Sequence, residues 1–541
     1  MFKNKLMRLP EIMKNLKRKS VAILALLVLV LSNTISAQEI KTNGRDWDRP
    51  ANSDWDGLKK EPLPEWVLDA KFGVYTHWGI FSVPAHGGPD YVKELYLADD
   101  KDVKGKGIKK YHIEKYGEIK DFGYKDFEPM FTAPKFNGQE WADVMKGAGA
   151  KFGGICLSHH DGFCLWDSKY TTWDSMDKGP KKDIYREIAD GIRKNDMKLV
   201  ATFHMARTYG YVYDAKDKYS KEQKKTWDIF DDANSRIYYD KDKMPKEEFA
   251  AEWAGKVREV IKNYRPDMLW FDGLSGSIKN DEVPQDTITS IFKDYYKQKS
   301  IDGDDVVVCN KLPGTKVWNF PLGFGLRCYE NCRDMEPNPQ GYWLADRAIG
   351  YPWSYVNNKK YRYGSDYHLK SLIDMVSRGG IFFLSLTPKG DGSIPDEEKE
   401  IMKGIGEWLG VHGEAIYSTR RWKHSAEGPA VMLRTTKTGK HKWDFTNMTG
   451  KDTRFTRSKD NTKLYATVLG IPEGNKITLK NLAKGEKIAT GGIKSIEFIA
   501  SNEAVKWEQT SEGLTIFFPE GGLNEVANAF RINMNGTLVY N

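Results

Sequence analysis

The stretch FGGICLSHHDGFCLW (residues 152–166) joins an apolar run to a dense polar cluster. Residues 152–157 have the length and composition of a fully buried strand, and Ser158, His159, His160 and Asp161 follow it directly. Two adjacent histidines and a carboxylate at the end of a strand are compatible with a metal site, a polar corner of a core or a sugar-binding pocket. The rest of the chain has to distinguish these three interpretations.

Six further short apolar runs have the same form. They are FGVYTHW (72–78), KLVATFH (198–204), MLWFD (268–272), VVVCN (306–310), GFGLRCYE (323–330) and GIFFLSLTP (380–388). Amphipathic stretches with helical periodicity lie between them, for example at residues 137–150, 181–196 and 247–264. Continuous apolar strands that alternate with helices predict a parallel sheet buried on both faces.

Polar residues fall at the carboxyl ends of these predicted strands. Besides the 158–161 cluster, they are His77, His204, Asp272, Asn310 and Glu330. A (β/α)8 barrel builds its active site on that rim, whereas a Rossmann sheet needs a glycine-rich turn after its first strand, which THWGIFS (76–82) does not provide. We therefore predict a (β/α)8-like (TIM) barrel. Its eighth strand is expected near residues 349–356, unless the barrel is irregular.

The pattern changes near residue 420. RRWKHSAEG (420–428) has the composition of a hinge, and beyond it short alternating runs such as residues 452–470 are separated by turn residues without convincing helices. This pattern is typical of a small antiparallel β-sandwich. The predicted domains are a signal peptide at 1–37, a catalytic barrel at 38–420 and the sandwich at 421–541.

Charge and cysteine content narrow the class of protein. Residues 1–37 hold seven Lys or Arg and one Glu, a net +6 of the total +8, so the rest of the chain carries only +2 and nucleic-acid binding has little electrostatic support. The lysine-rich runs near 101–110 and 216–225 are expected to be solvated surface. Five cysteines, an odd number without paired metal-ligand spacing, predict neither a disulfide framework nor a zinc site, and we expect no cofactor.

Several motifs together give a specific resemblance. HWGIFSVP (77–84) with a downstream ELY (94–96), HHDGFCLW (159–166), RPDMLWFDG (265–273), YENC (329–332) and the run from VSRGG to AIYSTR (376–420) occur in this order. They are similar to the successive signatures of the α-L-fucosidases of glycoside hydrolase family 29, and residues 452–470 resemble the C-terminal sandwich of that family. The resemblance implies a barrel enzyme that hydrolyses α-linked L-fucose with retention, without a metal or other cofactor.

The resemblance also implies roles for individual residues. Asp272 matches the nucleophile, and Glu330, which closes GFGLRCYE, matches the general acid/base. Residues that match or resemble those lining the sugar site are His77, Trp78, Glu94, His159, His160, Trp166, His204 and Trp270. Two carboxyl groups on either side of the anomeric carbon are what glycoside hydrolysis requires. Asp161 is expected to cap the following loop or to orient a histidine rather than to contact sugar.

Glu336, in MEPNP (335–339), is a rival for the acid/base, because it could lie on a loop that covers the site. The sequence also departs from the family pattern around the expected pocket. Ser158 stands where the family usually has lysine, ELY replaces EWY, and FFLSLTP (382–388) replaces LLNIGP. These changes leave a relative of L-fucose such as L-galactose open as the substrate sugar.

Two other classes of function remain. A metal-dependent barrel hydrolase would need an HxH pair at the first strand and a bridging lysine or further histidine, and HWG (77–79) does not supply the pair. A glycan-binding pseudoenzyme would not need both Asp272 and Glu330. The expected partner is a fucosylated or related glycan, and neither a nucleic acid nor a membrane span is expected once the signal is removed. The oligomeric state is left open.

We predict that the chain is exported and that its mature form begins close to Gln38. The basic segment KNLKRKS (14–20) precedes an eleven-residue apolar run at 21–31, with Ser36 and Ala37 before the expected cleavage site, and no cysteine follows for a lipid anchor. The destination would be the periplasm or the extracellular space. N-terminal sequencing of secreted protein should start near Gln38, and a start at Met1 or Met13 would contradict export by cleavage.

Overall fold

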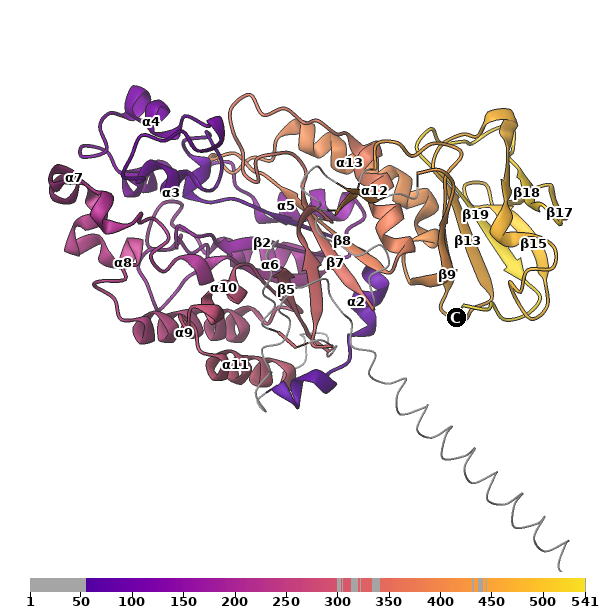
Figure 1. The fold of residues 1–541 in the computed structure, drawn as a ribbon, viewed down its shortest axis with the longest axis horizontal. Coiled ribbons are helices and arrows are strands. Elements are labelled where there is room, and N and C mark those ends of the chain that lie inside the picture. The colour runs from indigo at the N-terminus through magenta and orange to yellow at the C-terminus, as the bar shows by residue number, and fades with distance from the viewer. Residues whose placement is uncertain are drawn as a thin grey trace, which may run out of the picture. The chain divides into compact units, whose positions relative to one another are not determined.

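The structure is a computed structural model that describes residues 55–298, 303, 305–312, 320, 321, 323–332, 341–430, 433–435, 441–443 and 445–540. The predicted signal peptide and Glu336 lie outside the described residues. Eight parallel strands close into a barrel in the order β1 to β8, with helices outside the strands (Figure 1). This confirms the predicted (β/α)8 architecture.

The barrel strands are β1 (Phe72–Thr76), β2 (Phe152–Ser158), β3 (Lys198–Phe203), β4 (Met268–Phe271), β5 (Val307–Leu312), β6 (Leu326–Tyr329), β7 (Trp343–Ala348) and β8 (Gly380–Leu386). The α-helices are α2 (Glu65–Ala70), α3 (Tyr91–Leu95), α4 (Ile108–Tyr116), α5 (Gly138–Gly147), α6 (Ile184–Lys194), α7 (Lys221–Thr226), α8 (Ser235–Tyr238), α9 (Lys246–Tyr264), α10 (Leu274–Lys279), α11 (Gln285–Lys297), α12 (Ser365–Ser377) and α13 (Asp396–His412). Strands such as β1, β2 and β8 are buried at every residue, because the barrel interior covers one face and the helices cover the other.

One barrel strand, the one not recognised with certainty in the sequence, lies earlier in the chain than expected. It was predicted near residues 349–356, whereas the structure places it at Trp343–Ala348 as β7. Its sequence, WLADRA, carries Asp346 and Arg347 in mid-strand, so it lacks the continuous apolar run that marks the other strands. Asp346 is 0% exposed, and its carboxylate accepts hydrogen bonds from Tyr75 of β1 and from Cys328 of the neighbouring strand β6. The strand was not recognised from the sequence because its polar side chains have hydrogen-bond partners within the protein and so can be buried.

Glycines let several helices approach one another closely. A Cβ atom at Gly406 of α13 would lie 1.8 Å from the carbonyl oxygen of Gly147 at the end of α5. At Gly138 of α5 it would lie 2.6 Å from the backbone of Glu187 in α6. These positions admit only hydrogen, so the helices pack backbone against backbone around the barrel.

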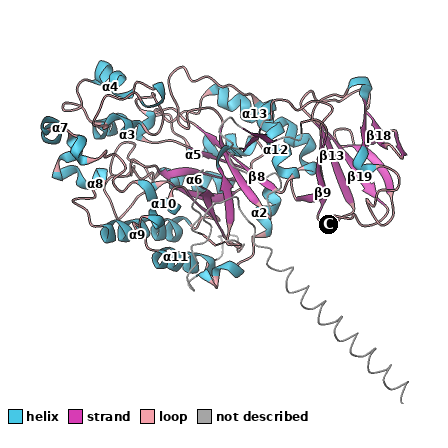
Figure 2. Ribbon diagram, in the orientation of Figure 1, coloured by secondary structure: helices cyan, strands magenta, loops and turns pink. Residues whose placement is uncertain are grey.

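The region after α13 folds as a β-sandwich, as predicted, and strands dominate it (Figure 2). Its strands are β9 (Thr419–Glu427), β10 (Leu433–Thr435), β11 (His441–Trp443), β12 (Thr453–Ser458), β13 (Lys463–Val468), β14 (Lys476–Leu479), β15 (Ile493–Phe498), β16 (Glu503–Ala504), β17 (Trp507–Thr510), β18 (Gly513–Phe517) and β19 (Asn528–Met534). A six-stranded sheet, β16-β15-β19-β13-β12-β9, and a three-stranded sheet, β14-β18-β17, bury one apolar cluster that includes Trp422, Leu514 and Phe530. The expected hinge at 420–428 is therefore wrong, because most of it forms β9.

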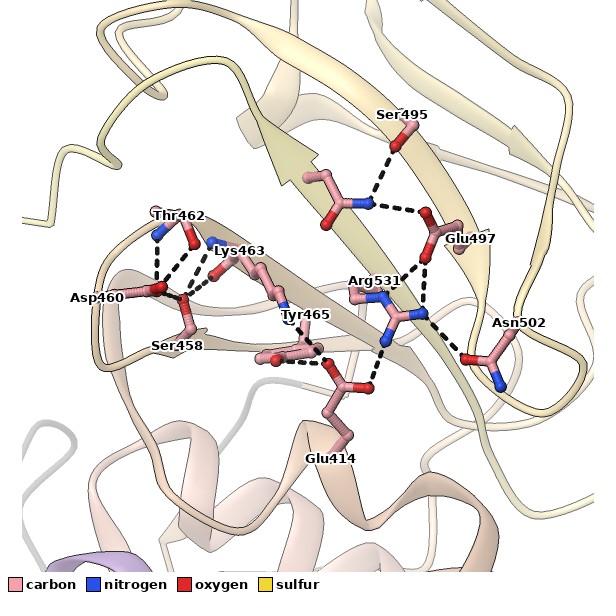
Figure 3. A network of polar contacts seen from close by, with 11 residues as sticks. Glu414, Ser458, Asp460, Thr462, Lys463, Tyr465, Ser495, Glu497, Asn502 and Arg531 are labelled. Atoms are coloured by element: carbon pink, nitrogen blue, oxygen red, sulfur yellow. Dashed lines mark hydrogen bonds and ion pairs between the residues drawn. The ribbon is translucent and has the colours of Figure 1, made fainter.

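Polar contacts join the sandwich to the last helices of the barrel. Glu414, which follows α13, accepts hydrogen bonds from Tyr465 of β13 (2.9 Å) and Arg531 of β19 (2.6 Å), as Figure 3 shows. The buried Arg454 of β12 pairs with Asp374 of α12. Both acidic residues come from the barrel side and both arginines come from the sandwich. The two domains thus share one buried charge pair, Arg454–Asp374, and one partly exposed pair, Arg531–Glu414, as well as apolar contacts.

All five cysteines are buried as free thiols: Cys156, Cys164, Cys309, Cys328 and Cys332. Burial raises the pKa of the Cys164 and Cys332 thiols to about 12. None of these five thiols is joined to another in the described structure. Among the helices that the structure describes, none has the length and apolar character needed to cross a membrane.

We predict opposite effects for two glycine substitutions in α13. Gly406→Ala should lower the free energy of unfolding by about 1–3 kcal/mol, because the new methyl group overlaps the Gly147 carbonyl and the helices must separate. Gly410→Ala meets no atom within 4 Å and should raise it by roughly 0.5–1 kcal/mol through helix propensity alone. Urea unfolding measures both. Equal effects of the two variants would show that the α5–α13 contact does not limit stability.

Candidate active site

The carboxyl ends of strands β1 to β4 bring four histidines and one carboxylate to one rim of the barrel. These residues are His77, His159, His160, His204 and Asp272. The backbone ladder continues just past the strands, since the N–H of His204 donates to the Ser158 carbonyl (3.1 Å) and that of Asp272 to the Phe203 carbonyl (2.9 Å). In a closed parallel barrel, all the strands end at the same rim, so residues nearly 200 positions apart become neighbours.

The four imidazoles pack against one another. Ring centroids are 4.2 Å apart for His159 and His160, 4.9 Å for His77 and His204, and 5.2 Å for His159 and His204. Burial holds the pKa of His77 and of His159 well below its usual range, and lowers that of His160 to about 4 and that of His204 to about 3. All four rings are therefore neutral near pH 7, and each offers one donor and one acceptor nitrogen.

The hydrogen bonds of His160 fix its tautomer. Its Nδ1 lies 2.7 Å from the carbonyl oxygen of His204, which can only accept, so Nδ1 carries the proton. The Nε2 atom is then an acceptor, and it lies 3.9 Å from Oδ2 of Asp272. Within the described residues, the buried Nδ1 of His159 and Nε2 of His204 have no hydrogen-bond partner. The cluster thus presents unused polar atoms around Asp272.

Lys311 of β5 supplies positive charge to the site. Its ammonium lies 3.7 Å from Oδ2 of Asp272 and 3.5 Å from Oε2 of Glu330, and its side chain is 9% exposed. Burial alone would raise the pKa of Asp272, but interactions with Lys311, His204, His160 and Arg207 hold it well below its usual range. Because the imidazoles are neutral, we assign the larger part of this effect to Lys311. Asp272 is therefore ionised near pH 7.

Asp272 and Glu330 are close enough to act on one bond. Each has an oxygen within 3.7 Å of the same ammonium nitrogen, so these two oxygens are at most about 7.2 Å apart. The separation of 5–5.5 Å that is typical of retaining glycosidases fits within this limit. Glu330 follows β6 directly and lies in a short 3-10 helix, Glu330–Cys332. Lys311 also reaches Asp346 of β7, at 3.6 Å.

Glu94 is held by a lysine from a neighbouring loop. Glu94 lies in α3, and its carboxylate forms a 2.7 Å ion pair with Lys106, whose side chain is 12% exposed. The Lys106 carbonyl in turn accepts a hydrogen bond from the His86 imidazole (2.6 Å). Lys109 is also mostly buried, and it donates to the Leu97 carbonyl. The expectation that the 101–110 run is solvated is therefore wrong at Lys106 and Lys109. Their ammonium groups bind carboxylate and carbonyl oxygens instead of water.

Two tryptophans border the histidine cluster. The ring of Trp270, in β4, lies 5.2 Å from His204, and its buried Nε1 has no hydrogen-bond partner among the described residues. Trp353, which follows β7, lies 5.0 Å from His77, and the Lys311 ammonium is 5.1 Å from the centre of its ring. Neither Trp353 nor Lys311 was predicted from the sequence. The signal for Lys311 was its position directly after the VVVCN run, which β5 extends by two residues.

The structure does not bring Trp78 or Trp166 to this cluster. The Trp78 ring packs against Phe136 and Trp141, and its N–H donates to the Lys389 carbonyl (2.7 Å). The Trp166 N–H donates to Glu259 of α9 (3.0 Å). Both indoles are fully buried, so their positions favour support of the surrounding loops over contact with a sugar.

Asp161 has the capping role expected of it. Its Oδ1 accepts a hydrogen bond from the backbone N–H of Phe163 (3.4 Å), and its Oδ2 accepts one from the Tyr124 hydroxyl (2.7 Å). Burial raises the pKa of Asp161 to about 6. In the part of the chain that the structure describes, no three His, Cys, Asp or Glu side chains are arranged to hold a metal ion.

Family models match both parts of the chain. A model described as "Alpha-L-fucosidase" matches residues 39–414, and one described as "Alpha-L-fucosidase C-terminal domain" matches residues 446–533. The first match alone covers more than half of the sequence. The chain belongs to the α-L-fucosidase family. It is a glycoside hydrolase of this family, with the barrel and sandwich in the family's order.

Individual relatives agree with this assignment. An α-L-fucosidase from Branchiostoma floridae is 27% identical over 503 residues, which cover 90% of this chain and 95% of the relative. The tissue α-L-fucosidase of Bos taurus is 28% identical over 476 residues, covering 86% and 87% of the two chains. Among solved structures, the Thermotoga maritima α-fucosidase in complex with fucose matches with a TM-score of 0.66 and 27% identity, over 88% of this chain and 99% of that one.

Proposed function

We propose that the protein is a retaining exo-α-L-fucosidase that acts by double displacement, with Asp272 as the nucleophile. The observation that carries this proposal is the pair Asp272 and Glu330, each with an oxygen within 3.7 Å of the Lys311 ammonium. Family membership and the fucose complex of the Thermotoga maritima relative support L-fucose as the sugar. The substrate is a fucosylated glycan.

In the first step, the ionised carboxylate of Asp272 attacks the anomeric carbon and forms a glycosyl ester. Glu330 gives its proton to the departing oxygen, so the leaving group departs as an alcohol. In the second step, Glu330 takes a proton from water, and the hydroxide adds to the anomeric carbon while the Asp272 ester bond breaks. Two inversions at one carbon return the original configuration.

The buried polar atoms around Asp272 would hold the sugar ring. His159 Nδ1, His204 Nε2 and Trp270 Nε1 lack partners in the described part of the chain, and His160 Nε2 is an acceptor beside the nucleophile. A polyhydroxylated ring supplies both donors and acceptors, so it suits neutral imidazoles better than a cation would. We place His77 and the Glu94 carboxylate, held by Lys106, in the same binding group. Trp353 would cover an apolar face of the sugar.

Glu330 is the preferred acid/base because it follows β6 directly and shares the Lys311 ammonium with Asp272. Glu336, the rival, lies outside the described residues and is compared by experiment below. L-Galactose remains the alternative sugar, since the departures at Ser158, ELY and FFLSLTP surround the site. Turnover of chromogenic α-L-fucoside and α-L-galactoside separates the two sugars, and no turnover of either would favour a glycan-binding pseudoenzyme. We further propose export to the periplasm or the extracellular space, on the basis of the N-terminal segment.

We predict that Asp272→Ala lowers turnover of an aryl α-L-fucoside by several orders of magnitude, because no covalent intermediate can form. Azide should restore part of the activity and give a product of inverted configuration, since a small anion can occupy the space left by the carboxylate. The matched control is Asp161→Ala, which removes a neighbouring carboxylate that caps a loop and should not respond to azide. Near-normal turnover in Asp272→Ala would exclude it as the nucleophile.

The role of Glu330 is tested by the chemistry of the leaving group. Glu330→Ala should lose far more activity on a natural fucosylated disaccharide than on a dinitrophenyl fucoside, whose leaving group needs no proton. Glu336→Ala is the comparison. If Glu336→Ala gives the selective loss, and Glu330→Ala lowers both rates equally, the acid/base is Glu336.

A further inference from the structure

Asp346 is a third carboxylate next to the two that react, and the reaction does not use it directly. It lies in mid-strand in β7 and is 0% exposed. Its Oδ2 accepts a hydrogen bond from the Tyr75 hydroxyl (3.3 Å) and its Oδ1 accepts one from the Cys328 thiol (3.1 Å). Both donors are neutral and come from other barrel strands. A buried carboxylate in such a place needs a counter-charge as well as hydrogen bonds.

Lys311 supplies that counter-charge and divides it among three acids. Its ammonium lies 3.6 Å from Asp346, 3.7 Å from Asp272 and 3.5 Å from Glu330. Within the described residues, it is the one cation within 4.0 Å of Asp346. A lysine has a long flexible side chain and a compact charge, so the position of its ammonium group depends on the groups that surround it. Asp346 is the fixed member of the three, because Tyr75 and Cys328 hold both of its oxygens.

We propose that Asp346 is a positioning residue that holds the Lys311 ammonium between Asp272 and Glu330. This inference rests on the proposed double displacement. Asp346 itself touches neither the sugar nor the leaving group and forms no bond in the reaction.

During the reaction, negative charge moves between two of the three acids that surround Lys311. Before attack, Asp272 is negative and Glu330 is protonated. Once the glycosyl ester has formed and the leaving group has taken the proton, Asp272 is neutral and Glu330 is negative. The negative charge has moved from one partner of Lys311 to the other, while Asp346 stays negative throughout. The ammonium therefore faces the same total charge in both steps and need not move.

Asp346 and Lys311 each favour the charged form of the other. Burial raises the pKa of Asp346, while the Lys311 ammonium opposes that rise and favours the charged form. Burial alone would lower the pKa of Lys311, but the three carboxylates raise it well above its usual value. The other titratable groups that face Asp346 are Tyr75 and Cys328, and burial raises the pKa of both far above neutrality.

The test is the pH dependence of kcat/KM in Asp346→Asn, measured on 4-nitrophenyl α-L-fucoside. Asparagine keeps the shape and removes the negative charge, so Glu330 should lose its proton at lower pH. The alkaline limb of the profile, where the acid/base deprotonates, should move down by about 0.5–1.5 pH units for a charge at most about 7 Å away. Lys311→Met removes the opposite charge and should move the same limb upward.

The control is Asp374→Asn. Asp374 is an equally buried acid of α12, paired with Arg378 and Arg454 outside the barrel interior, so its loss should lower thermal stability and leave the limb in place. An unshifted limb in Asp346→Asn, or an upward shift, overturns the proposal and leaves Asp346 a structural residue. If Asp346→Asn does not fold, an unshifted limb in Lys311→Met overturns it as well.

Failure of the proposed function gives a different result. The configuration of the first product released by the wild-type enzyme tests double displacement without any variant of Asp346. A dinitrophenyl fucoside needs no acid to assist its leaving group. With this substrate the alkaline limb of the kcat/KM profile should therefore disappear. Its loss would assign the limb to the acid/base. Retention together with an unshifted limb in Asp346→Asn would reject only the role of Asp346.

Discussion

Closure of the barrel between β1 and β8 is the constraint on which the rest of the structure depends. The Phe382 N–H donates to the Lys71 carbonyl (2.8 Å) and the His77 N–H donates to the Leu386 carbonyl (3.0 Å), which joins residues more than 300 positions apart. The same seam sets the Nδ1 atom of His77 2.8 Å from the Ser385 hydroxyl. Without this pairing the sheet would have two open edges, and the strand ends would not converge on Asp272.

The sequence was sufficient to predict most of the barrel, because residues buried on both faces of a parallel strand leave a continuous apolar run. It failed at β7, where Asp346 interrupts the run, since a polar residue in a strand is recognised as buried only when its partners are known. The strand-end residues His159, His160 and Asp272 could be found because position in a barrel strand determines position at the rim. Lys106 and Trp353 could not, because both lie outside the strands and reach the site through tertiary contacts.

The site is built at a cost to the folded state. Each buried polar atom without a partner costs about 1–3 kcal/mol, and His159, His204 and Trp270 each contribute one. Burial of the Lys311 ammonium costs its hydration free energy. Three carboxylates offset that cost. The close helix contacts at Gly138 and Gly406 and the shared core of the sandwich provide stability elsewhere. A sugar that bonds to the unpaired atoms would stabilise the folded protein in proportion to its affinity.

Burial shields all five thiols of the folded chain from oxidants and alkylating reagents. Only a thiolate reacts readily, and burial both suppresses the thiolate and blocks access to Cys164 and Cys332. Cys156 and Cys328 belong to β2 and β6, and Cys309 belongs to β5, so three of the five become reachable only when the barrel itself opens. Modification of a barrel thiol therefore reports unfolding. In a molecule that carries such a modification, the barrel has opened at least once.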